Sequence, residues 1–239
     1  MLSCSFERDL YLVQPQDSFI IPSSLSYPES YSTPLFASDT KFKDIHKRLG
    51  LSPTVASILD DVSFLTTTIL SIPTSKNSPA DCSPNKGSKF AQSTALWIYK
   101  NYHLLPINTS DNSSTIDIIY ETIHISAMVY TSAIASRVPF SLSYTSELRL
   151  KLYENLRRVD LSSWKKMPGI LLWILFVACP GSGNDVQGRL LRRTASLTSI
   201  YLGFRALALS HWCLRRLWGV QRWIVDGGYA TDSEEWTIE

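Results

Sequence analysis

The stretch WKKMPGILLWILFVACPGSG, residues 164–183, is the most apolar part of the chain and decides the fold. It is typical of a membrane anchor, of a strand that leads into a nucleotide-binding loop, or of the core of a soluble domain. Eleven residues separate Pro168 from Pro180. As a helix they would span about 16 Å, whereas the hydrocarbon core of a bilayer is about 30 Å thick. The length therefore argues against a membrane span.

The turn that follows, GSGNDVQG at residues 181–188, lacks the features of a phosphate-binding loop. A P-loop needs a lysine after its last glycine, and a dinucleotide-binding loop needs glycines at its first, third and sixth positions. The lysine is missing and the third glycine is misplaced. We therefore expect a turn that ends one helix and lets Asn184 or Asp185 start the next. Periodicity alone leaves a buried strand open for the apolar run, but Pro168 suits the first turn of a short, fully buried helix.

The other apolar segments follow helical spacing, and we find no convincing set of alternating strands. Ser52 and Pro53 are typical of a helix start, and Ser114 with Asp117 resembles a capping box. Pro139 is expected to end the helix that Ser114 begins. The fold class is thus predicted to be all-α, an irregular multi-helix domain. Its helices are expected over residues 52–70, 88–105, 113–138, 146–159 and 187–217. Four of them show an apolar stripe. The stripe consists of Val55, Ile58, Leu59, Val62, Leu65 and Ile69 in the first helix; of Ile116, Ile119, Tyr120, Ile123, Ala127, Tyr130 and Ile134 in the third; of Leu148, Leu152, Leu156 and Val159 in the fourth; and of Leu197, Ile200, Tyr201, Phe204, Leu207, Ala208 and His211 in the last.

The predicted domain is flanked by segments of different composition. Residues 1–40 form a flexible N-terminal arm in this interpretation, because residues 14–40 are rich in Ser, Pro and Tyr and lack a helical period. The all-α domain covers residues 41–228 and contains a disordered loop at residues 73–88. Residues 229–239 form an acidic tail. The N-terminus lacks the basic and apolar runs of a secretory signal.

The chain of 239 residues carries a net charge of +2, but residues 141–225 hold 13 Lys and Arg against 4 Asp and Glu. Such a segment suits a nucleic acid or an acidic partner, or simply a helical domain with solvated arginines, which we favour. The C-terminal part, residues 211–225, mixes aromatic and basic residues. It is consistent with a nucleic-acid surface, with a peripheral membrane helix, or with an amphipathic helix whose Trp side chains pack inward under Arg stems. We favour the last. The residues concerned are Trp212, Trp218 and Trp223 with Arg215, Arg216 and Arg222.

The residues that usually carry chemistry do not assemble into a recognisable site. Asp60 and Asp61 are adjacent in a helix, so their side chains diverge by about 100°. We therefore expect no catalytic, cofactor-binding or metal-binding residues and no cofactor. The four cysteines lack metal-ligand spacing, and Cys179 and Cys213 are predicted to be buried thiols. His124 and His211 are expected to be hydrogen-bonded core residues. The cysteines are Cys4, Cys82, Cys179 and Cys213, and the histidines are His46, His103, His124 and His211.

Three motifs, in this order, resemble the C-terminal regulatory region of fungal zinc-cluster transcription factors. They are RVPFS at residues 137–141, WKKMPGILLW at residues 164–173 and VQRWI at residues 220–224. The resemblance covers roughly residues 88–228. Each motif is weak alone, but their order and spacing together are moderately specific.

The resemblance implies an all-α regulatory domain that follows a six-cysteine binuclear zinc cluster. This chain has four unclustered cysteines, so we expect no zinc cluster and no direct DNA binding through one. The expected function is transcription regulation in the nucleus, without enzymatic activity and without a membrane. It would act through contacts with other transcription-regulatory proteins or with a second copy as a homodimer, and through sensing of a ligand. The alternative is a small α-helical ligand-binding protein or enzyme with a buried apolar pocket.

Overall fold

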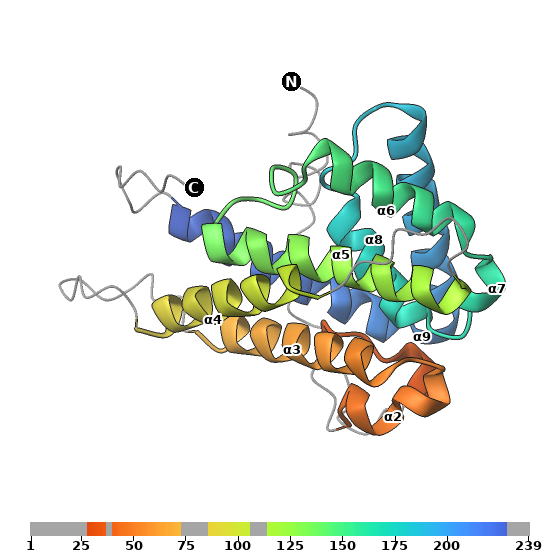
Figure 1. Cartoon of the computed structure of the whole chain (residues 1–239), viewed down its shortest axis with the longest axis horizontal. Helices are drawn as coiled ribbons and strands as arrows, with labels where there is room; N and C mark the ends of the chain where they lie inside the picture. Colours follow the sequence, from red (N-terminus) through yellow and green to blue (C-terminus); the bar gives the residue numbers. More distant parts are fainter. Residues whose placement is uncertain (1–27, 37–39, 73–85, 106–113, 229–239) are drawn as a thin grey trace.

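The computed structural model describes residues 28–36, 40–72, 86–105 and 114–228, and these residues form helices and no strand (Figure 1). The prediction of an all-α fold is confirmed. α5 crosses the front of the molecule, with α8 behind it and α3 and α4 running beside it (Figure 1). The elements are η1 (Glu29–Tyr31), α2 (Phe42–Leu49), α3 (Pro53–Leu70), α4 (Lys86–His103), α5 (Thr115–Ser136), α6 (Ser146–Arg158), α7 (Leu161–Trp164), α8 (Pro168–Ala178) and α9 (Val186–Gly228).

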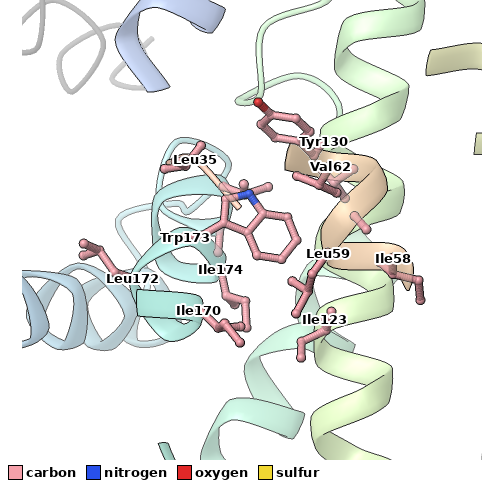
Figure 2. Packing of buried hydrophobic residues seen from close by; sticks show 14 of the residues in the cluster. Leu35, Ile58, Leu59, Val62, Ile123, Tyr130, Ile170, Leu172, Trp173 and Ile174 are labelled. Carbon is pink, nitrogen blue, oxygen red and sulfur yellow. The ribbon is translucent and has the colours of Figure 1, made fainter. Parts of the chain in front are cut away.

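α8 is the short helix expected from the apolar run, and it lies at the centre of the core. Pro168 occupies its first turn, where the missing N–H costs no helical hydrogen bond. Every side chain from Pro168 to Ala178 is buried except that of Phe176, which is half-buried. Figure 2 shows Trp173 pointing from α8 toward Leu59 of α3. The indole also meets the ring of Tyr130 edge-on, with ring centroids 6.2 Å apart. α8 is therefore a helix of the hydrophobic core.

α5 is the second core helix, and its start is the predicted capping box. Ser114 accepts a hydrogen bond from the backbone of Asp117, whose carboxylate accepts one from the backbone N–H of Ser114. α5 is the one helix of the described residues long and apolar enough to cross a bilayer, by length and composition alone, and 83% of its most apolar window is buried. The buried hydroxyl groups of Thr122 and Ser126 donate to carbonyl groups one turn earlier, and that of Tyr130 bonds to the hydroxyl of Thr66 on α3. These bonds satisfy polar groups that would otherwise destabilise the core.

α3 and α4 complete the framework around α5. Ser52 caps α3 as predicted, because its hydroxyl oxygen accepts a hydrogen bond from the backbone N–H of Val55 at 3.2 Å. The six apolar residues predicted to line one face of this helix are all buried. The buried face of α4 consists of Ala91 and Ala95, followed by Ile98 and Tyr102, and this helix packs on α5.

The turn between α8 and α9 is the predicted helix junction. The carboxylate of Asp185 accepts a hydrogen bond from the backbone N–H of Gly188 at 2.7 Å, so Asp185 caps α9. A Cβ atom at Gly188 would lie 1.8 Å from the carbonyl oxygen of Gly183, so only glycine fits there. The guanidinium of Arg192 also donates to the carbonyl of Gly183, at 3.0 Å. Hydrogen bonds from Gly188 and Arg192 within the chain thus fix the conformation of this turn.

The expectation of a flexible arm over residues 1–40 is wrong for residues 28–36. Leu35 is fully buried, and the η1 segment packs on α8. The approach is close because Gly169 has no side chain: a Cβ atom there would lie 2.3 Å from the carbonyl oxygen of Tyr31. Residues 1–27 and 37–39 lie outside the described residues.

Three further predictions need correction. The loop predicted at residues 73–88 does not extend through residues 86–88, because α4 begins at Lys86. Residues 73–85 and the whole predicted acidic tail, residues 229–239, lie outside the part of the chain that the structure describes. Ile116, expected on the buried face of its helix, is exposed, since it belongs to the first turn of α5. The long C-terminal helix runs to Gly228 rather than ending near Leu217.

The apolar stripe predicted along α9 also differs from the structure. Leu197, Ile200 and Tyr201 are exposed, whereas Leu191 is buried. α9 therefore packs through a neighbouring face in its first half. Helical periodicity indicates that a face is apolar, but not which face meets the core. The side chains of residues 202–208 are not described.

Candidate functional site

A cluster of buried polar side chains lies where α5 meets α6 and α4. Glu121 of α5 is buried, and its Oε1 atom lies 2.6 Å from the ammonium nitrogen of Lys151 on α6. The side-chain amide of Asn155 donates to the other carboxylate oxygen of Glu121 at 2.9 Å. A buried carboxylate needs such partners, because leaving water is costly for an unpaired charge. The cluster ties α6 to α5.

His124 lies one turn after Glu121 and joins α5 to α4. The Nε2 atom lies 2.9 Å from the carbonyl oxygen of Tyr102, so this nitrogen is the donor and Nδ1 carries no proton in the neutral ring. None of the described residues donates a hydrogen bond to Nδ1. The ring stacks on Tyr120 at 5.6 Å between centroids, and burial lowers the pKa of His124. The prediction of a hydrogen-bonded core histidine is confirmed for this residue.

Tyr102 extends the cluster to α3. Its hydroxyl group donates to the carbonyl oxygen of Ile58 and lies 3.3 Å from a carboxylate oxygen of Asp61. Burial raises the pKa of Tyr102 and that of Asp61. Asp60 points elsewhere, since its carboxylate accepts backbone hydrogen bonds at the start of α2. The two aspartates thus serve two different contacts, as their adjacency in a helix predicted.

The side chains of His46 and His103 make their hydrogen bonds outside this cluster. His46 contacts the carbonyl oxygen of Lys43 at 2.8 Å, and His103 contacts the hydroxyl of Tyr99 at 2.8 Å. His211 is half-buried on α9. Within the described ranges, no three His, Cys, Asp or Glu side chains are grouped as metal ligands. The cluster around His124 joins α3, α4, α5 and α6 through an ion pair and hydrogen bonds between buried side chains and their neighbours.

The two described cysteines are buried thiols, as the sequence predicted. Cys179 follows α8 and Cys213 lies on α9, and both are free. Burial raises the pKa of each thiol to about 12. A thiol with this pKa is protonated near neutral pH and is a poor nucleophile or metal ligand. Cys4 and Cys82 lie outside the described residues.

Most side chains in the Trp-rich and Arg-rich part of α9, residues 211–225, are buried or half-buried against the rest of the protein. Arg216 donates to the carbonyl oxygen of Leu35 at 3.2 Å, and its guanidinium lies 5.8 Å from the ring centroids of Phe36 and Trp212. Burial lowers the pKa of Arg216. These contacts bind the 28–36 segment to α9, which favours the amphipathic interpretation over a nucleic-acid surface at this arginine.

Arg137, the first residue of the RVPFS motif, connects three helices in a way that the motif alone does not predict. It ends α5 in the left-handed conformation, with φ at 51°. Its guanidinium lies 4.0 Å from the ring centroid of Trp223 on α9 and donates a hydrogen bond to Ser88 on α4. Burial lowers the pKa of Arg137. Residues this far apart in sequence give no local signal of their contact.

The surface of the described residues carries two exposed apolar faces. Phe90 and Trp97 are exposed on α4, seven residues apart, and Leu104, directly after the end of this helix, is exposed as well. On the first half of α9, a longer set is exposed, which we call the α9 stripe. Exposed apolar patches of this kind mark interaction surfaces. The α9 stripe consists of Val186, Leu190, Leu197, Ile200 and Tyr201.

Comparisons with known proteins do not assign a family to these features. No protein-family model matches the chain, and neither a curated protein nor a solved structure shows significant similarity to it.

Proposed function

We propose that this chain is a transcription-regulatory domain that acts in the nucleus through protein–protein contacts. The partners are other transcription-regulatory proteins or a second copy of the chain, and an apolar ligand is a candidate signal. The proposal rests on the ordered motifs RVPFS, WKKMPGILLW and VQRWI, which resemble those of fungal zinc-cluster regulators. It does not include DNA binding through a zinc cluster.

The contacts among these motifs are the observation that carries the proposal. Arg137 of the first motif stacks over Trp223 of the third, at 4.0 Å. Phe140 of the first motif stacks on Tyr130, with ring centroids 5.4 Å apart, and Tyr130 meets Trp173 of the second motif. Segments that meet in one core are coupled in folding, so their joint occurrence has a physical basis. This supports treating the three short motifs as one signal.

The distribution of polar and apolar groups supports protein contacts over chemistry. Glu121, Tyr102 and the Nε2 atom of His124 bond to neighbouring helices, as the residues of a scaffold do. Apolar side chains on α4 and on α9 are exposed instead, where a partner could cover them.

A tethered reporter tests the proposal. The full chain, fused to an unrelated DNA-binding domain, is expected to change expression of a reporter gene that carries the matching binding site. The Leu175→Asp variant, which buries a charge in α8, is expected to lose this effect together with the fold. A well-expressed nuclear fusion that leaves reporter output unchanged would contradict the proposal.

A ligand-binding protein or enzyme with a buried apolar pocket is the second candidate, and one observation favours it. The Nδ1 atom of His124 is buried without a hydrogen-bond donor among the described residues, and an aromatic ring lies on its face. An experimental structure with a cavity of about 300 Å³ next to this nitrogen would support the candidate. A closed core without a cavity around His124 would contradict this second candidate function.

A further inference from the structure

The α9 stripe has the spacing of a helix-docking seam. Val186, Leu190, Leu197 and Ile200 occur at intervals of four, seven and three residues, with Arg193 at the position between Leu190 and Leu197. These are the core positions of a heptad pattern, in which side chains of one helix insert between those of another. The seam covers about four turns of α9, or about 22 Å.

Among the described residues, the rest of the fold leaves this seam exposed. In the same half of α9, Gly188 and Leu191 are buried and Ala195 is partly buried against the core. Leu190 and Leu197 point away from that contact and are 41% and 57% exposed. Figure 1 shows the first turns of α9 at the edge of the molecule, beyond α6.

The charges around the seam indicate what would cover it. Arg193 lies within the seam and Arg189 lies beside it, and both are exposed. The one acidic residue of α9 is Asp226, near the far end of the helix. A partner that buries Arg193 must supply a carboxylate, because an arginine buried without a counter-charge is costly. The seam therefore fits a helix that carries an acidic residue among its apolar ones.

This requirement weighs against two other occupants, a second copy of the chain and a membrane. A second copy of α9 would bring another Arg193 and no carboxylate, so like charges would meet in the interface. An anionic membrane suits basic residues at the flanks of an apolar face. Here Arg193 stands in the middle of the apolar residues, where insertion would bury its charge in the lipid.

We propose that the α9 stripe docks an amphipathic α-helix of a partner protein, whose apolar side chains pack along Leu190, Leu197 and Ile200 and whose carboxylate pairs with Arg193. This inference names the partner chemistry of the proposed regulatory function and rests on that function. It needs no movement of the core.

Peptide binding to the purified full chain tests the inference. The probe is a fluorescent three-heptad helix with Leu at its core positions and one central Glu, and the matched probe carries Lys in place of the Glu. The wild-type chain is expected to bind the Glu probe about tenfold or more tightly than the Lys probe in fluorescence anisotropy. The Arg193→Glu variant is expected to reverse this preference.

Two surface variants complete the test. Leu197→Glu is expected to abolish binding of both probes without changing the melting temperature, whereas Leu142→Glu, at an exposed leucine outside α9, is expected to bind like the wild type. Equal affinity for the two probes, or no binding of either, would overturn the inference. If the wild type dimerises and Leu197→Glu abolishes the dimer, the seam binds a second copy of the chain. If the wild type floats with anionic vesicles and this variant does not, the seam binds a membrane. Because the assay uses no reporter gene, its failure leaves the reporter result standing.

Discussion

Replacing Leu175 in α8 with alanine measures how much the central helix contributes to stability. Leu175 is 0% exposed, whereas Leu197 on α9 is 57% exposed, so Leu197→Ala is a control with the same change of side chain. Removing a fully buried leucine side chain costs about 2–5 kcal/mol, because apolar contacts are lost and a cavity is left. The same change at an exposed site stays within about 0.5 kcal/mol.

A loss of about 3 kcal/mol at Leu175 corresponds to a fall in melting temperature of about 6–12 °C for a chain of this size. Urea unfolding followed by far-UV circular dichroism gives the free energy, and a thermal scan gives the temperature. Leu197→Ala should unfold at the same urea concentration as the wild type. Equal losses for the two variants, or a Leu175→Ala variant as stable as the wild type, would refute the assignment of α8 to the core.

The remaining predictions concern the arm, the buried ion pair and the buried histidine. Gly169→Ala should lower the free energy of unfolding by about 1–3 kcal/mol and expose the 28–36 segment to protease, whereas Gly183→Ala, with 3.6 Å to the nearest atom, should not. Lys151→Ala should cost about 2–3 kcal/mol in urea unfolding, because it leaves the Glu121 carboxylate buried without its cation. Burial lowers the pKa of His124 in the folded chain, so the unfolded chain binds the proton first as the pH falls. The free energy of unfolding should therefore be constant above about pH 6.5 and decrease as the pH falls from there toward the lowered pKa. His124→Gln should remove this pH dependence in urea titrations at several pH values.

Each of these predictions has a result that would contradict it. Protease resistance of residues 28–36 in Gly169→Ala would mean that the segment does not depend on the close approach to α8. A Glu121→Gln and Lys151→Met double variant should recover most of the stability lost in Lys151→Ala, and no recovery would argue against the ion pair as the cause. An unchanged pH slope in His124→Gln would assign the slope to other groups.

Local signals accounted for the helices and their ends. Ser52, the Ser114–Asp117 pair and Pro168 were recognisable because a helix start is decided by a few neighbouring residues. The length and flanks of the apolar run were enough to predict a buried helix for α8. The predicted pattern of α3 was also confirmed, because a single apolar face leaves one way to pack.

Contacts between distant residues could not be predicted in this way. Leu35 stands in a stretch rich in Ser and Pro, and it is buried because Gly169 lets the backbone of η1 approach α8. The contact of Arg137 with Trp223 joins two helix ends far apart in sequence. In α9, apolar residues occur on more than one face, so periodicity did not decide between Leu191 and Leu197 as the core side.

We have proposed that the chain regulates transcription through contacts made by the surface of a helical scaffold. The most direct test is the tethered reporter with the Leu197→Glu and Ile200→Glu double variant, which alters exposed residues of the α9 stripe. We predict that this variant keeps the wild-type melting temperature and expression level and loses the effect on reporter output. A fully active double variant would contradict the claim that this surface makes the regulatory contact.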